Sequence, residues 1–257
     1  LKAYTQALKA VETASKDKYG QGAIKLNIIG IVGMVPPKTS TLAGGGVSGA
    51  ATAIAANLTA VLARGTIDRF GIEEQVGGNP SSNVGTDYYA RVTTKQQETI
   101  DQNTPDATVK YMKIVSNAPR VAANPEARKR ASELAGVTGS IKVPTLTLHT
   151  QYDPLAIVQN EGSLIVAANT VGNDARRLLQ PDVISPPIFY PDKNQQVAGA
   201  GHCSFTADSV AGGIVILNNW VQLGQFPTYA STTELLGPDS GYNPNFLITK
   251  WPSGPTE

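Results

Sequence analysis

The chain has 257 residues, of which 41% are hydrophobic and 16% are charged, and its formal net charge at pH 7 is +1. This composition excludes an intrinsically disordered chain and predicts a folded protein of one domain or one and a half domains. The basic residues are scattered apart from the short run 128–130, so the charge pattern does not indicate a nucleic-acid-binding surface. The longest apolar run, residues 28–35, is far shorter than the roughly 20 residues that a membrane span needs, and we expect no transmembrane segment.

Residues 1–130 are predicted to be mainly helical, because they contain no convincing strand pattern. Amphipathic periodicity predicts four helices, and loops rich in glycine, proline and asparagine separate them. The predicted helices are 1–16, 20–34, 50–64 and 106–116. We expect this region to form a helical cap.

Residues 131–224 have the alternating pattern of an α/β fold with a parallel sheet. The predicted elements are a strand at 143–149, a helix at 157–170, a short strand at 195–198 and a helix at 206–223. Residues 225–257, with several Gly-Pro and Asn-Pro steps, are expected to be an irregular C-terminal tail. Two strands do not make a stable parallel sheet, because their edges leave backbone groups unpaired, so the remaining strands are expected to come from elsewhere.

Two residues next to the predicted strands carry the main chemical signal. Asp153 follows the first strand and precedes a proline, and His202 lies in a Gly-Ala-Gly-His loop just before a helix. An imidazole is the base that a serine hydroxyl needs, and a carboxylate on its other ring nitrogen fixes the tautomer. We therefore predict Asp153 as a catalytic acid residue and His202 as a catalytic base, with His149 in a buried structural role. Rival acids without the strand-end position are Asp174, Asp182 and Asp192.

Several patches of the chain, taken in order, resemble a group of secreted microbial α/β-hydrolases that have a helical cap. The patches are Gly77–Tyr88, Ala118–Pro125, Val143–Thr150, Asp153, Gln159–Glu161 and Ala200–Thr206. The resemblance covers roughly residues 1–224, although the insertion at 181–194 is longer than expected. It implies a serine esterase, lipase or peptidase-like enzyme, in which Asp153 matches the acid and His202 the base. It also implies that the nucleophile serine, the oxyanion hole and the first strands precede Leu1 in the family's order, so we expect a separate N-terminal companion chain to supply them.

Other interpretations of the sequence stay open. A peptidase of the same fold, and a non-catalytic binding protein that has lost its nucleophile, are the main alternatives. An internal nucleophile at Ser48 is disfavoured because Gly46–Ala50 lacks the last glycine of a nucleophile elbow and follows no strand. The glycine loop Gly44–Gly49 also fits a dinucleotide-binding pattern, but again without a preceding strand. Two histidines and one cysteine give no zinc-binding spacing, so we expect neither a metal nor a cofactor.

Three features bear on where the protein works. The chain begins at Leu1 without methionine, which indicates processing or truncation. Cys203 is the single cysteine, so it is either a small buried thiol or one end of a disulfide to the companion chain. Asn57 begins an Asn-Leu-Thr glycosylation sequon. Together these features predict a secreted, extracellular protein.

Overall fold

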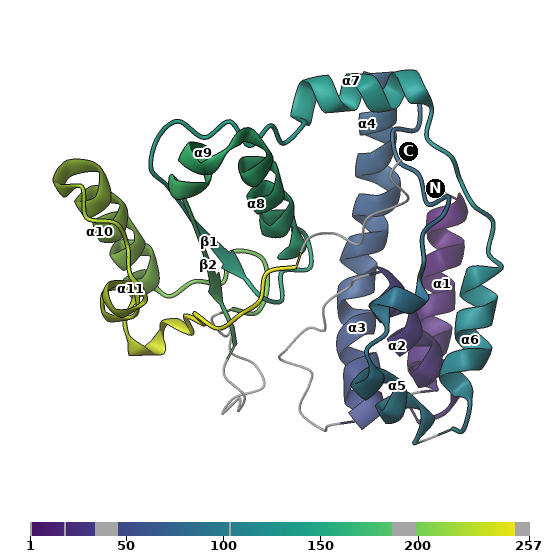
Figure 1. Cartoon of the computed structure of the whole chain (residues 1–257). Coiled ribbons are helices and arrows are strands. Elements are labelled where there is room, and N and C mark those ends of the chain that lie inside the picture. Colours follow the sequence, from purple (N-terminus) through teal and green to yellow (C-terminus); the bar gives the residue numbers. More distant parts are fainter. Residues whose placement is uncertain (1, 18, 34–45, 103, 187–198, 250–257) are drawn as a thin grey trace. The chain divides into compact units, whose positions relative to one another are not determined.

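The computed structural model describes residues 2–17, 19–33, 46–102, 104–186 and 199–249. The chain divides into two compact units, of which the first ends at Gly136 and the second begins at Val137 (Figure 1). The boundary predicted from the sequence, residue 130, lies within helix α7, Pro125–Ala135. This helix packs against helix α4, Arg69–Val76, so its whole length belongs to the first unit.

The first unit is helical, and its described residues contain no β-strand. The predicted helices correspond to α1, α2, α3 and α6, each to within a few residues. Three further helices, α4, α5 and α7, were not among the four predicted, because they are short and lack a long apolar stripe. The helices of the unit besides α4 and α7 are α1 Lys2–Lys16, α2 Gln21–Gly33, α3 Gly46–Ala63, α5 Thr94–Asp101 and α6 Ala107–Ser116.

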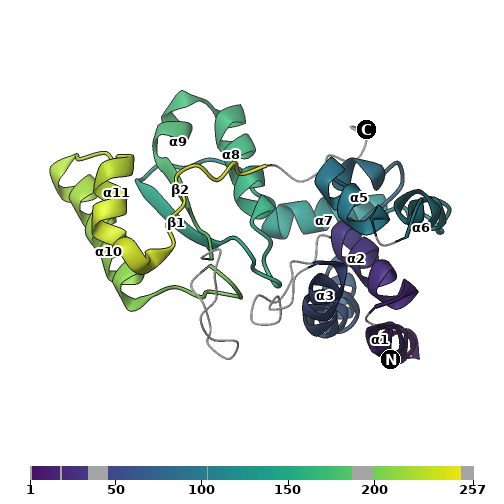
Figure 2. The same cartoon turned by 90° about the horizontal axis from the view of Figure 1, so that it is seen from below.

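Helix α2 is the centre of the first unit's core. It is apolar on almost every side, which is the pattern of a helix enclosed by others, and Leu26 and Ile28 are each 1% exposed. Ile54 and Leu58 of α3 and Met112 of α6 belong to the same cluster. Helices α1, α2 and α3 lie side by side in both views (Figure 2).

Helices α3 and α4 are joined by a π-helical turn, Arg64–Asp68, so that they form one long helical stretch. Part of this stretch, Ala50–Val76, is 27 residues long and apolar enough by composition to cross a membrane, and 28% of its most apolar window is buried in the protein. Core helices of soluble proteins meet the same criterion, so this is weak evidence for a span. The expected lack of a transmembrane segment stays a prediction.

The second unit contains a two-stranded parallel sheet with helices on both faces (Figures 1 and 2). Strand β1, Thr145–Thr150, pairs with β2, Leu179–Ile184, in the register Thr145 to Leu179 and Thr150 to Ile184. Because side chains alternate along a strand, Leu179 packs towards one pair of helices and Ile184 towards the other. The first pair is α8 Gln159–Val171 and α9 Asn173–Arg177; the second is α10 Ala207–Leu223 and α11 Tyr229–Leu236.

The second strand was not predicted at its observed place. The predicted strand 195–198 lies outside the described residues, and β2 falls in a segment that was interpreted as a proline-rich loop. Pro181 in β2 favoured that interpretation, because proline cannot donate to a strand ladder. The Thr145 amide donates to the Leu178 carbonyl at 2.8 Å, so the backbone groups of Leu178 and of every second residue after it face β1. Pro181 is one of the residues in between, and its nitrogen therefore faces away from β1. The missing N–H therefore removes no bond between the strands.

Residues 225–249 are part of the second unit and are not the irregular tail that we expected. Helix α11 begins with a capping box in which the Thr228 and Ser231 side chains each accept from the other residue's amide. Further along, the Asn243 amide donates to the Val183 carbonyl at 2.9 Å, on the outer edge of β2. This segment thus covers the side of β2 that does not face β1.

Candidate functional site

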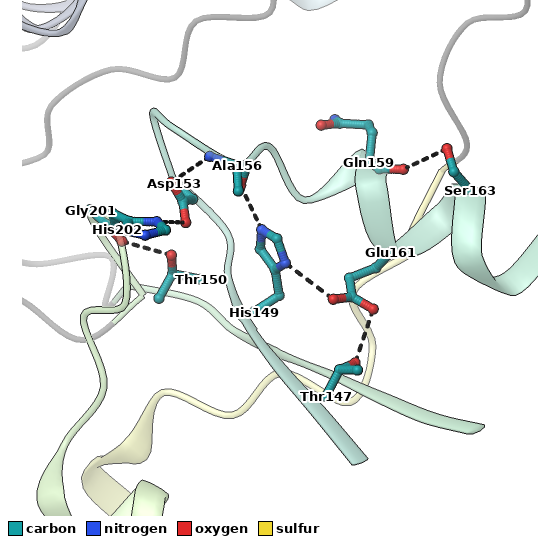
Figure 3. Close-up of polar contacts among 10 residues, drawn as sticks. All are labelled: Thr147, His149, Thr150, Asp153, Ala156, Gln159, Glu161, Ser163, Gly201 and His202. Carbon is teal, nitrogen blue, oxygen red and sulfur yellow. Dashed lines mark hydrogen bonds and ion pairs between the residues drawn. The ribbon is translucent and has the colours of Figure 1, made fainter. Parts of the chain in front are cut away.

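The predicted acid and base come together at the carboxyl ends of the two strands (Figure 3). Asp153 follows β1 directly, and His202 lies in the loop that leads to α10. A parallel bridge between Tyr152 and Ala200 fixes this approach, with the Tyr152 amide donating to the Gly199 carbonyl at 3.0 Å. The position of Asp153 after a strand and that of His202 in a glycine loop before a helix are the signals from which the sequence predicted the pair.

Asp153 holds the His202 ring in one orientation. The distance between His202 Nδ1 and Asp153 Oδ2 is 2.7 Å. Asp153 Oδ1 accepts from the amides of Leu155 at 2.8 Å and Ala156 at 2.9 Å, so both carboxylate oxygens are engaged. Since a carboxylate only accepts, Nδ1 carries the hydrogen, and Nε2 has the lone pair whenever the ring is neutral. Asp153 is 5% exposed at its side chain and His202 is 49% exposed, so the ring is open to a reacting group while its anchor is buried.

The backbone of the His202 loop is held in an unusual conformation. Gly199, Gly201 and Cys203 all have positive φ angles, of 80°, 104° and 55°. A Cβ atom on Gly199 would lie 2.4 Å from the carbonyl carbon of Ser185, so only glycine fits there. The buried Thr150 hydroxyl donates to the Gly201 carbonyl at 2.7 Å and ties the loop to β1. Positive φ at a non-glycine residue such as Cys203 is a strain that tends to mark functional loops.

Cys203 is exposed and free, which excludes the alternative that it is a small buried thiol. Its predicted disulfide to a companion chain stays a prediction. Asn57 lies in the interior of α3 with only 9% of its surface exposed, so its burial argues against the glycosylation expected there.

A second imidazole–carboxylate pair lies beside the first and was not predicted (Figure 3). His149 Nδ1 lies 3.2 Å from Glu161 Oε1, and His149 Nε2 lies 2.7 Å from the Ala156 carbonyl oxygen. The Thr147 hydroxyl donates to the other oxygen of Glu161 at 2.9 Å. His149 was expected to be buried, and its side chain is 11% exposed, so it is largely but not fully buried. The signal available in the sequence was that residues 147 and 149 share a face of the strand and Glu161 falls in the first turn of the next helix.

The environment of His149 favours its charged form. Burial by itself lowers the pKa of the imidazole, but hydrogen bonds to Glu161 and to the Ala156 carbonyl, together with the nearby carboxylates of Glu161 and Asp153, outweigh it and raise the pKa above its ordinary value. The geometry leads to the same conclusion, because both ring nitrogens face groups that accept hydrogen bonds and only the charged imidazole can donate from both.

The rival acids do not approach His202 in the described structure. Asp182 lies within β2 and is 2% exposed, and burial raises the pKa of its carboxyl to about 6. Asp174 lies in α9, and Asp192 lies outside the described residues. Asp153 is thus the acid that the structure brings to the histidine.

Ser48 lies in the first turn of α3 in the first unit, and its side chain is outside the description. Gly44 and Gly45 of the glycine-rich pattern also lie outside the described residues. The described part of the first unit provides no strand before that pattern, and dinucleotide binding requires one. No group of three or more potential metal ligands gathers within the described ranges.

The outer edge of β1 is open in the described structure, where the sheet has only the two strands. Because the Thr145 and Gln151 amides donate to the β2 side, the backbone groups of Leu146, Leu148 and Thr150 point away from β2. The site therefore consists of an anchored, half-exposed imidazole at the end of a sheet that has room for a further strand.

Comparison of the chain with protein-family models, curated proteins and solved structures finds no match.

Proposed function

We propose that the second unit carries the acid and the base of a serine hydrolase that cleaves ester or amide bonds. The observation that carries this proposal is the His202–Asp153 pair, in which a buried carboxylate holds Nδ1 of a half-exposed imidazole ring. This arrangement fits general-base activation of a hydroxyl nucleophile. The nucleophile serine and the oxyanion hole are proposed to come from polypeptide outside these 257 residues.

The open edge of β1 supports the second part of the proposal. A parallel strand added at this edge would end on the same side of the sheet as Asp153 and His202, because the carboxyl ends of parallel strands lie together. A nucleophile on the turn after a strand of such a sheet would be near the ring. The added strands would also satisfy the outward-pointing backbone groups of Leu146 and Leu148.

The proposed chemistry follows from these positions. Nε2 of His202 accepts the serine proton as the serine oxygen bonds to the substrate carbonyl carbon, and Asp153 stabilises the imidazolium that forms. The same nitrogen then gives the proton to the leaving alcohol or amine as its bond to the carbonyl carbon breaks. A water molecule, deprotonated by His202, hydrolyses the acyl-enzyme and restores the serine.

Fluorophosphonate labelling of the protein from its native source tests the proposal. We expect a labelled serine on polypeptide that lies outside these 257 residues and copurifies with them. His202→Ala and Asp153→Asn should slow labelling by about 10³-fold or more, whereas the control Asp174→Asn, in the exposed helix α9, should label like the wild type. A label on a serine within the 257 residues, or equal labelling of all variants, would refute the proposal. A folded protein with no labelled serine would support the alternative of a non-catalytic binding protein.

Two finer parts of the proposal have their own readouts. Secretion and a covalent companion chain are the first of these parts: the exposed thiol of Cys203 is accessible to a second polypeptide, and reductant should release that polypeptide in intact-mass analysis. A single mass near 27 kDa with and without reductant would oppose the interchain bond. Relative rates on a chromogenic ester and on a peptide anilide would separate an esterase from a peptidase of the same fold.

A further inference from the structure

We propose that Glu161 and His149 form a positioning pair that holds Asp153 in the orientation needed by His202. The two pairs are connected through the backbone of a single residue, Ala156 (Figure 3). The role in catalysis rests on the proposed function, whereas the contacts and their effect on the His202 ring are independent of it.

The connection can be followed atom by atom. Glu161 Oε1 receives the hydrogen bond of His149 Nδ1, and His149 Nε2 donates to the Ala156 carbonyl at 2.7 Å. The Ala156 amide donates to Asp153 Oδ1 at 2.9 Å, and Asp153 Oδ2 binds His202 Nδ1 at 2.7 Å. Ala156 is thus held on one side by His149 and itself holds the carboxylate on the other. A shift of Ala156 would alter the direction in which Asp153 meets the imidazole of His202.

The pair has features of a rigid anchor. His149 and Glu161 are 11% and 13% exposed at their side chains, so water competes little for their hydrogen bonds. Thr147 fixes the second oxygen of Glu161, and the three residues join β1 to the first turn of α8. A histidine that only filled space would not need an acceptor at each nitrogen.

The charge on His149 strengthens this anchor. With acceptors at both nitrogens, the ring meets both only as an imidazolium, which donates twice. The charged groups that face it are Glu161 from α8 and Asp153 from the turn after β1, and the neighbouring residue on β2 is the apolar Val183. Charge-assisted hydrogen bonds are roughly twice as strong as neutral ones. Loss of the Glu161 charge should therefore loosen the hold on Ala156.

The chain offers a clean spectroscopic test because it contains only two histidines. ¹⁵N-histidine labelling of the 257-residue chain should show His149 donating from both ring nitrogens and, for the neutral ring of His202, an excess of the Nδ1–H tautomer over the Nε2–H tautomer. The variants are Glu161→Gln, which keeps the shape and removes the charge, and the double variant Glu161→Gln with His149→Phe, which leaves His202 as the single histidine. Ser163→Ala on the same helix is the matched control, since its hydroxyl contacts only the Gln159 carbonyl.

We expect Glu161→Gln to abolish the imidazolium signal of His149 near neutral pH and to lower the Nδ1–H to Nε2–H ratio of His202 several-fold. The double variant should lower that ratio by about tenfold, because the hydrogen bond from a fixed carboxylate is what favours the Nδ1–H form. The control should leave both signals unchanged. Circular dichroism checks that each variant is folded, and if the double variant is not, Glu161→Gln decides alone.

An unchanged His202 ratio in a folded variant would overturn the proposal and leave the pair as a packing element. A neutral His149 in the wild type near neutral pH would overturn it as well. These spectra need no nucleophile, so they separate this inference from the proposed function. A shifted His202 ratio together with absent fluorophosphonate labelling would refute the hydrolase and keep the positioning pair. In an active enzyme, Glu161→Gln should lower kcat with little change in KM, and Ser163→Ala should change neither.

Discussion

The carboxyl group of Asp182 is a buried acid whose ionisation opposes folding, and this predicts a pH-dependent stability. It is 2% exposed, Gln180 donates to its Oδ1 at 2.7 Å, and its Oδ2 has no hydrogen-bond partner among the described residues. Burial raises its pKa from 3.8 to about 6, although interactions with Gln180 and Tyr242 act in the opposite direction. The folded protein therefore binds this proton more tightly than the unfolded chain.

The size and sign of the effect follow from that shift. A rise of about two pKa units corresponds to about 3 kcal/mol between the two protonation states. Because the folded-state pKa is the higher one, the stabilising contribution is complete below about pH 4 and is lost as the pH rises through about 6. Asp182→Asn keeps an acceptor for Gln180 and cannot ionise. It should raise the free energy of unfolding by about 3 kcal/mol at pH 8 and change it little at pH 4.

Urea unfolding of the wild type and Asp182→Asn between pH 4 and pH 8 measures this difference. The fluorescence of Trp220, a residue of α10 that is 7% exposed, reports on the unit. Asp174→Asn, an exposed acid of the same unit, is the control and should show no such pH trend. A variant that is less stable than the wild type at pH 8, or a difference that does not vary with pH, would refute the reasoning.

Three further substitutions test the packing of the second unit. Cys203→Gly should raise the free energy of unfolding by about 1 kcal/mol or less, and with it the melting temperature, because glycine relieves the left-handed backbone at φ 55°. A lower melting temperature would contradict this. Gly212→Ala would place a Cβ atom 1.9 Å from the Leu235 carbonyl oxygen, so it should destabilise the α10–α11 contact by about 1–3 kcal/mol and speed amide exchange in α11. Ile184→Ala, at a fully buried site between β2 and α10, should lower the free energy of unfolding in urea by about 2–5 kcal/mol, and a loss below 1 kcal/mol would show that the cluster is loosely packed.

Local patterns in the sequence were sufficient to locate an element where the spacing of its apolar residues or a capping residue determines the structure. The helices α1, α2, α6 and α10 and the strand β1 were located to within about two residues. The patterns failed where tertiary context decides. Pro181 is compatible with β2 only because its nitrogen lies on the outer side of the pair, which no local signal reveals.

The candidate site divides in the same way. Asp153 was predicted because it follows a strand, and His202 because it lies in a glycine loop just before a helix; the resemblance to capped α/β-hydrolases pointed to the same two residues. The partnership of Glu161 with His149 depends on how α8 lies over β1, and its first turn brings the carboxylate over the strand. Asn57 was misleading because a sequon carries no information on which face of a helix it occupies.

The side of β1 that faces away from β2 carries no further strand among the described residues, and this also affects how these 257 residues behave in solution. The six residues of the strand, Thr145–Thr150, include no proline, lysine or acidic residue, and those are the residues that usually protect an exposed strand from self-pairing. Two copies can therefore join edge to edge and continue the sheet from one molecule into the next. We therefore expect the isolated polypeptide to associate as its concentration rises. A polypeptide that occupies that edge should suppress this association.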